Sequence, residues 1–144
     1  MKVFCRNRKA FFNYEVIEKY EAGIELHGPE IKYLTTGKSD LSGSYAKFLN
    51  IAKGSKPELY LIGTRIGEAE NADRSRRLLM HRKELTRLIS KINEKNLTLV
   101  PLMIYGKNGR AKVEIALAKG KKEHNKKETL KRRDIERQIE IELK

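Results

Sequence analysis

The residues best suited to catalysis or metal binding are few in this chain of 144 residues: three histidines and one cysteine. His27, His81 and His124 lie far apart, and no two have the i, i+4 spacing of paired metal ligands on a helix. Cys5 precedes Arg6, whose charge could lower the pKa of the thiol, but no histidine stands at a recognisable partner position. Neither a nucleophile-elbow motif nor a phosphate-binding loop is present. The sequence therefore predicts no catalytic site, no metal and no cofactor.

Positive charge is the chemical property that this chain has in excess. Its 32 lysines and arginines outnumber its 19 acidic residues, which gives a formal net charge of +13. Such an excess favours a polyanionic partner, either nucleic acid or an anionic membrane surface. No apolar run approaches the ~20 residues that span a bilayer, and the chain does not start like a signal peptide. A single cysteine excludes an internal disulfide. We therefore expect a cytoplasmic protein with no membrane segment.

The positive charge is concentrated in three blocks. The N-terminal arm has four basic residues before its first acid, Glu15. Residues 74–91 hold seven basic side chains and one acid, and residues 119–133 hold eight basic side chains and two acids. Each block alone could be a solvated surface. Together, the three blocks favour binding to a polyphosphate chain.

Short β-strands dominate the secondary structure that the pattern predicts. Strands are expected at 14–20 and 23–27 around a turn at 21–23, and then at 44–51, 58–66, 97–105 and 110–118. Gly28 and Pro29 predict the start of a short helix over 30–35, which Gly37 ends. Residues 53–57 are expected to form a hairpin loop, and the polar residues 67–77 a mobile segment.

The second half of the chain has the stronger signals. Leucine and isoleucine recur with helical spacing between His81 and Glu94, which predicts an amphipathic helix with one basic face, capped at Asn96. The strand at 97–105 is apolar at both odd and even positions, so both of its faces should be covered, and Pro101 indicates a bulge or an unpaired edge. Asn108-Gly109 is the strongest hairpin signal in the chain.

These elements predict a mainly β fold. About six antiparallel strands and two short helices indicate a closed or nearly closed β-barrel of the OB type, formed by residues 1–120. Residues 121–144 are expected to be a separate basic tail with a thin apolar stripe and opposite charges at i, i+4. We expect this tail to be wholly or partly disordered alone and helical when bound; a permanently packed helix is the alternative.

An ordered set of motifs along the chain resembles the SsrA-binding protein family, also called small protein B. The matching segments are 5–10 with Tyr14, 20–24, 28–34 with Gly37 and Lys38, 44–46, 76–85, 97–102, 107–109, 112–114 and 117–122. Each segment alone is a weak signal, but their shared order over nearly the whole chain is specific.

The resemblance implies a non-catalytic, OB-like RNA-binding protein of trans-translation, the rescue of stalled bacterial ribosomes. Proteins of the family bind the tRNA-like domain of transfer-messenger RNA and deliver that RNA to the ribosome, roughly in place of a missing anticodon arm. The tail would enter the empty decoding site and mRNA path, where it folds into a helix and contacts small-subunit ribosomal RNA. Elongation factor Tu and alanyl-tRNA synthetase are implied as indirect partners.

The resemblance also points to particular residues. Asn7, Glu21 and Met80 match positions implicated in RNA binding, although Met80 stands where leucine is usual. The full set of expected RNA-binding residues is Arg6, Asn7, Arg8, Lys9, Glu21, Lys38, Arg76, Arg77, Met80, Lys107, Lys119, Gly120, Lys121 and Lys122. The expected ribosome-contacting residues of the tail are Asn125, Lys126, Lys127, Lys131, Arg132 and Arg133.

Some residues depart from the family pattern or have another explanation. The triplet 125–127 reads Asn-Lys-Lys where the family has Asp-Lys-Arg, which weakens any bidentate contact there. Thr35 replaces a usual arginine and removes one possible phosphate contact, and Pro29 replaces a small polar residue. The alternative for Glu21 is an acid at the barrel rim, paired with a basic residue.

Two other functions remain open from the residues alone. A general binder of single-stranded nucleic acid on an OB-type barrel would stack bases on exposed aromatic rings, for which the chain offers six tyrosines. A small RNA-modifying enzyme is the other alternative, which the lack of a visible catalytic set disfavours.

Overall fold

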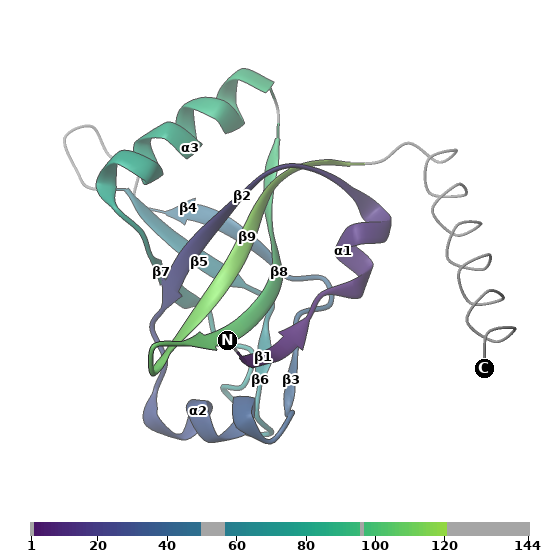
Figure 1. Ribbon diagram of the computed structural model, residues 1–144, viewed down its shortest axis with the longest axis vertical. Coiled ribbons are helices and arrows are strands. Elements are labelled where there is room, and N and C mark those ends of the chain that lie inside the picture. The colour runs from purple at the N-terminus through teal and green to yellow at the C-terminus, as the bar shows by residue number, and fades with distance from the viewer. Residues whose placement is uncertain (1, 50–56, 96, 121–144) are drawn as a thin grey trace, which may run out of the picture.

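The computed structural model describes residues 2–49, 57–95 and 97–120 (Figure 1). The predictions for the hairpin loop, for the cap at Asn96 and for residues 121–144 lie wholly or largely outside these described residues. The strands are β1 (Lys2–Arg6), β2 (Tyr14–Ile24), β3 (Ser39–Asp40), β4 (Tyr45–Leu49), β5 (Glu58–Ile62), β6 (Arg65–Ile66), β7 (Arg76–Leu79), β8 (Thr98–Lys107) and β9 (Arg110–Gly120). The helices are α1 (Arg8–Asn13), α2 (Gly28–Thr35) and α3 (Arg82–Lys95).

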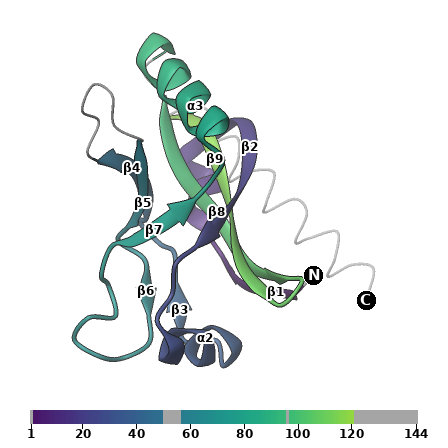
Figure 2. The same cartoon turned by 90° about the vertical axis from the view of Figure 1, so that its left-hand side faces the viewer.

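Six antiparallel strands form a closed ring. Their order is β8-β4-β5-β7-β2-β9, and pairing between β8 and β9 closes the circle. The strand β1 pairs with the end of β8, and β3 and β6 form a separate two-stranded sheet. In both views α2 and α3 lie at opposite ends of the molecule (Figures 1 and 2). The ring confirms the prediction of a mainly β barrel with about six antiparallel strands, although the described chain has three helices instead of two.

The strand β8 is covered on both faces, as its apolar pattern predicted. Leu99 and Ile104 belong to the main core, whereas Val100 and Leu102 pack in a second cluster with Ala10 of α1. A register shift between Pro101 and Met103 marks the predicted bulge. The short helix α1 therefore covers the outer face of β8 and shields it from solvent.

Local signals fixed three other elements. Pro29 lies in the first turn of α2, and Gly37 beyond the helix has a φ of 78°. Asn108 and Gly109 have φ angles of 53° and 74°, the left-handed pair that a tight hairpin between β8 and β9 requires. The helix predicted at 81–94 is observed as α3, with Leu85 and Leu88 buried. These predictions are confirmed.

The predicted turn at 21–23 is wrong. The strand β2 continues through these residues and pairs with β9 from Tyr14 to Gly23. Gly23 supports a close approach instead of a turn, because it pairs with Leu79 of β7 and a Cβ there would lie 3.4 Å from the Cβ of Leu79.

The predicted mobile segment at 67–77 is wrong in its last part. Residues 76 and 77 begin β7, which joins β5 to β2 in the ring. The N-terminal arm was likewise not predicted to contain an element, yet it forms β1 and α1. In both places, segments rich in basic residues form regular strands or helices that the sequence pattern did not predict.

Arg76 explains why this strand was missed. Its side chain is 0% exposed, and it forms a buried ion pair with Glu30 of α2, with 2.5 Å between Nη2 and Oε2. The same guanidinium donates to the carbonyl oxygens of Thr64, Ala72 and Arg74 at 2.7–3.0 Å. Every branch of the arginine therefore has a partner inside the protein.

Glu30 accepts hydrogen bonds from three separate residues in this arrangement. One carboxylate oxygen accepts from the amide of His27 at 2.8 Å, where α2 begins, and also from Arg74. Burial of the carboxyl opposes its ionisation, but the hydrogen bonds from His27, Arg76 and Arg74 outweigh burial and hold the Glu30 pKa below its ordinary value. The carboxylate thus ties α2 to β7 and to the segment that precedes β7.

Replacement of Arg76 by methionine should lower the free energy of unfolding by about 3–5 kcal/mol, because it removes the donor to the carbonyls of Thr64 and Arg74 and to one oxygen of the buried Glu30 carboxylate. Urea unfolding followed by circular dichroism at pH 7 measures this change. The matched control is Arg74→Met, whose side chain is 22% exposed and which should cost much less. Equal losses for the two variants would contradict the central role of Arg76.

Candidate nucleic-acid interface

The strand pair β2–β9 separates the expected RNA-binding residues into two groups. Tyr14 pairs with Gly120 at one end of this ribbon, and Gly23 pairs with Lys112 at the other. Glu21 lies seven residues from Tyr14 along β2, which is on the order of 20 Å at the usual rise of a strand. Figure 1 shows β2 and β9 running from α1 to the β8–β9 hairpin. One group of residues therefore lies beside α1 and the other near the hairpin.

Glu21 lies near the hairpin end, held by residues of β8. The hydroxyl of Tyr105 donates to Glu21 Oε2, and Lys107 Nζ lies 3.5 Å from the same oxygen. The Tyr105 hydrogen bond, with a contribution from the charges of Lys107 and Lys112, keeps the Glu21 pKa below its ordinary value. Burial and the adjacent carboxylate raise the pKa of Tyr105, so its hydroxyl keeps its proton and remains a donor. The basic partner that the alternative for Glu21 described is therefore present, and it is Lys107.

The structure brings Glu21 and Met80 to one surface hollow. Leu79, His81 and Lys112 also line it. Met80 packs partly against the core at the end of β7, and Glu21 remains 41% exposed on its side chain. Two residues that are 59 positions apart in the sequence thus meet where β7 pairs with the end of β2. An anionic acceptor beside an apolar contact is suited to selective binding of a base or a ribose hydroxyl.

Asn7 is placed differently from Glu21. Its side chain is buried: Oδ1 accepts from the amide of Ala10 at 3.2 Å and Nδ2 donates to the carbonyl of Pro101 at 2.8 Å. It therefore caps α1 and attaches that helix to the bulge in β8. Any effect of Asn7 on RNA binding would act through the position of α1 and its exposed neighbours Arg8 and Lys9.

The remaining predicted residues are distributed over the surface, with one exception. Arg6, Lys9, Lys38, Lys107, Lys119 and Gly120 are exposed, and Arg77 is half-buried on β7. Lys119 lies near the start of β2, because it pairs with Glu15, whereas Lys38 forms a surface ion pair with Glu68 at 3.3 Å. Arg76 is the exception, because its guanidinium is fully enclosed by the protein and is not accessible to RNA in this structure. The six tail residues and Lys121 and Lys122 lie outside the described part of the chain.

Two residues near Glu21 were not among those predicted. Tyr105 was considered only as a possible stacking ring, and its buried hydroxyl instead orients Glu21. Lys112 lies at the Glu21–Met80 hollow. The alternation along residues 110–118 could have placed Lys112 on the outer face. No local signal indicated the bond from Tyr105 to Glu21, which joins residues 84 positions apart.

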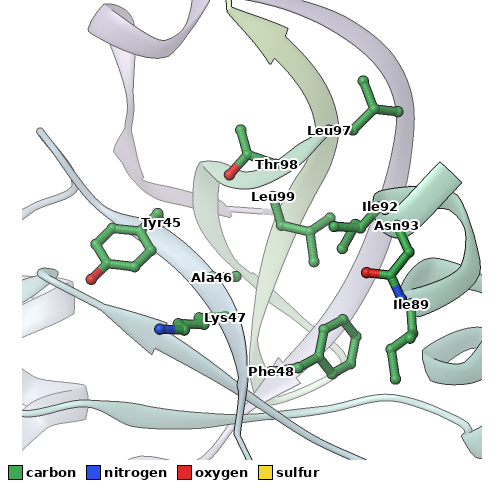
Figure 3. A pocket seen from close by; sticks show the side chains of 10 residues that line it. All are labelled: Tyr45, Ala46, Lys47, Phe48, Ile89, Ile92, Asn93, Leu97, Thr98 and Leu99. Carbon is green, nitrogen blue, oxygen red and sulfur yellow. The ribbon is translucent and has the colours of Figure 1, made fainter. Parts of the chain in front are cut away.

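A different hollow, of about 380 Å³, lies between α3 and the β4–β8 junction (Figure 3). Its walls are mainly apolar and include Phe48, Ile89, Ile92 and Leu99. Only Ala46 and Leu99 pair between β4 and β8, which leaves this part of the barrel wall open. Lys47 is the one charged residue of the lining. This composition is unsuited to binding phosphates.

Other kinds of site find little support in the described residues. No cluster of three or more histidine, cysteine or acidic side chains forms a metal site among them. Burial raises the pKa of the Cys5 thiol, so the expectation that Arg6 could lower it is wrong. Within the described ranges, no helix is long and apolar enough to cross a membrane. Of the six tyrosines, all of which are described, only Tyr45 is exposed.

The barrel and its charged surface together define a small protein of the nucleic-acid-binding class. A family model described as SmpB protein matches residues 4–144, and the chain belongs to the SmpB family. This family consists of non-catalytic RNA-binding proteins, which confirms both the sequence resemblance and the prediction that the chain is not an enzyme.

Individual relatives agree with the family match. An SsrA-binding protein from Dehalococcoides mccartyi is 46% identical over 145 residues, covering 96% of this chain and 81% of that protein. An SsrA-binding protein from Sulfurihydrogenibium sp. is 45% identical over 150 residues, covering 99% and 95%. A solved chain from "tmRNA-SmpB: a journey to the center of the bacterial ribosome" matches with a TM-score of 0.62 and 43% identity, covering 87% of this chain and 92% of that one.

Replacement of Tyr105 by phenylalanine should raise the pKa of Glu21 toward its ordinary value, because the variant removes the donor that contributes most to lowering it. The ring remains to fill its buried position. NMR titration of the glutamate side-chain carbons measures the change directly. The control is Tyr60→Phe, which removes a hydroxyl that donates to Glu58 on β5. An unchanged Glu21 pKa in Tyr105→Phe would contradict the assigned hydrogen bond.

Proposed function

We propose that this chain binds the tRNA-like domain of transfer-messenger RNA and delivers that RNA to stalled ribosomes for trans-translation. The observation that carries the proposal is the match of residues 4–144 to the SmpB family. The similar proteins from other bacteria are SsrA-binding proteins and the similar solved chain comes from a study of tmRNA-SmpB, which supports the identity of the RNA. A net charge of +13 supports strong attraction to any RNA but does not select one.

Selectivity would come from the surface around Glu21 and Met80. A carboxylate accepts hydrogen bonds and repels phosphates, so it favours a base amino group or a ribose hydroxyl over the backbone. Tyr105 and Lys107 already engage one oxygen of Glu21, which fixes the carboxylate before RNA arrives. Met80 would supply an apolar contact beside it. Lys107 and Lys112 reduce the repulsion that Glu21 imposes on a nearby phosphate.

The basic residues of the barrel and those of the tail would bind different RNAs. In this proposal the OB-like barrel, residues 1–120, holds transfer-messenger RNA. The tail, residues 121–144, contacts ribosomal RNA in the empty decoding site and mRNA path, through Asn125, Lys126, Lys127, Lys131, Arg132 and Arg133. The protein would act in the cytoplasm, roughly in the place of an anticodon arm. Elongation factor Tu and alanyl-tRNA synthetase would meet it only through the shared RNA.

A general single-strand binder is the function to be distinguished. Five of the six tyrosines are not exposed, which disfavours a stacking platform. The isolated tRNA-like domain of transfer-messenger RNA should bind more tightly than an ordinary tRNA or an unstructured strand at every salt concentration. Titrations of the three RNAs at several salt concentrations test this. Equal affinities with equal salt slopes would contradict the proposal.

Truncation after Gly120 should leave binding of the tRNA-like domain largely unchanged, apart from the contribution of Lys121 and Lys122, and abolish ribosome rescue, because the proposed ribosomal contacts lie beyond that residue. Affinity titrations and a reconstituted assay with mRNA lacking a stop codon measure the two effects. The full-length chain with the six proposed tail residues replaced by serine is the matched control for loss of length. A large loss of RNA affinity on truncation would contradict this division of labour.

A further inference from the structure

We propose that the RNA-binding surface extends from Glu21 and Met80 along a furrow to Ile31 and the β8–β9 hairpin, and that this furrow holds one unstacked nucleotide of the bound RNA. The inference rests on the proposed function and adds to it a second contact and its ligand: a base lying on aliphatic side chains, with its phosphate next to Arg110. Beyond Glu21 and Met80, Lys107 is the one predicted RNA-binding residue that borders this part of the surface.

Three neighbouring hollows make up the furrow. The hollow at Glu21 and Met80 shares Gly23, Leu79 and Lys112 with a second hollow. That second hollow shares Ile31 and residues 109–111 with a third, which also includes Lys2 and Phe4. Because neighbouring hollows share lining residues, the three adjoin one another between the end of β7 and α2. Figure 2 shows β7 passing between α3 and α2 on this side of the barrel.

Two large apolar side chains are exposed on the floor of the furrow. Leu79 is 50% exposed and Ile31 is 53% exposed, and both line the middle hollow together with Leu26. Large apolar side chains that gather on the surface mark an interaction site more often than isolated ones do. The close pairing of Gly23 with Leu79 gives this floor its shape, since a Cβ at Gly23 would fill space beside Leu79.

The rim of the furrow is basic. Arg110 and Lys112 border the middle hollow, and Lys2 and Lys107 border the third. The acidic residues, Glu21 and Glu84, are confined to the far end beside Met80. An apolar floor with cationic edges complements a nucleotide, whose base has a flat apolar face and whose phosphate is an anion. An apolar protein partner would gain nothing from this rim.

The decisive comparison pairs two exposed aliphatic residues on strands. Leu79→Ser should weaken binding of the tRNA-like domain about five- to tenfold, because the base loses its apolar support. Ile17→Ser, at a residue that is 45% exposed on β2 toward the α1 end of the ribbon, should leave the affinity unchanged. Thermal unfolding of both variants checks that the barrel is intact. Equal affinities for Leu79→Ser and Ile17→Ser would overturn the proposal.

A second pair tests the phosphate contact without touching the apolar floor. Arg110→Gln should weaken binding and lower the slope of log affinity against log salt by about 0.7–0.9, the value for one phosphate, whereas Arg65→Gln on β6 should do neither. A 2-aminopurine placed in turn at the unpaired positions of the domain should report one base whose emission changes on binding to the wild type but not to Leu79→Ser. If no position gives such a change in emission, the proposal is also overturned.

The same titrations separate this inference from the proposed function. Wild type that fails to prefer the tRNA-like domain over tRNA contradicts the proposed function. A different result is that the wild type keeps this preference, Glu21→Gln loses it, and both Leu79→Ser and Arg110→Gln bind normally. That result supports the proposed function and overturns only the furrow.

Discussion

A buried ion pair between Glu30 and Arg76 determines how the two halves of this barrel meet. Arg76 begins β7, the short strand that joins β5 to β2 and so completes one side of the ring. Its guanidinium also donates to the carbonyls of Thr64, Ala72 and Arg74, so one side chain joins three points of the chain before β7. The position of Leu79 and Met80 beside Gly23 and Glu21 follows from the placement of this strand. The candidate interface therefore depends on a contact that no RNA can reach.

A charged pair is a costly way to fill a core, since each ion loses its hydration. Here the cost is offset by the number of hydrogen bonds that one arginine and one carboxylate make, including the bond from the amide of His27 at the start of α2. An apolar pair of similar size could pack but would remove the side-chain donor to the carbonyls of Thr64 and Arg74. The pair thus specifies the course of a segment that has little regular structure of its own. This is why Arg74 and Arg76 of the basic block turn inward while Arg82, Lys83 and Arg87 on α3 remain exposed.

The same contact explains which parts of the fold sequence reasoning could predict. Elements with local signals were found: the leucine spacing of α3, the Asn108-Gly109 turn and the two-faced apolar run of β8 each depend on residues close in sequence. The segment before β7 depends on an arginine that finds its acid 46 positions away, and no composition rule tells a buried arginine from an exposed one. Gly23 was misjudged for a related reason. A glycine that admits a neighbouring strand has the same local signature as a glycine that makes a turn.

The candidate site was predictable to a similar extent. The family resemblance named Glu21 and Met80, and the fold brings them together. The resemblance could not name Tyr105 or the apolar floor at Leu79 and Ile31, because both depend on contacts between residues that are far apart in the sequence. Burial of Asn7 and Arg76 could not be foreseen either. The family resemblance placed both among the RNA-binding residues, whereas their partners in the structure are backbone groups and a carboxylate of the same chain.

Glu21 shows how this surface differs from one that only attracts phosphate. It stands directly opposite Glu114 across β2 and β9, an arrangement of like charges that weakens a sheet. Lys19 lies 3.7 Å from Glu114 and Lys107 lies 3.5 Å from Glu21, so each acid has its own cation. A lysine at position 21 would relieve the repulsion and add to the attraction for RNA. Retaining a carboxylate there, and holding it with a buried tyrosine hydroxyl, makes physical sense if the surface must accept hydrogen bonds from particular groups of its ligand. The excess charge then brings RNA to the protein, and the few residues that are not basic decide how well a given RNA fits.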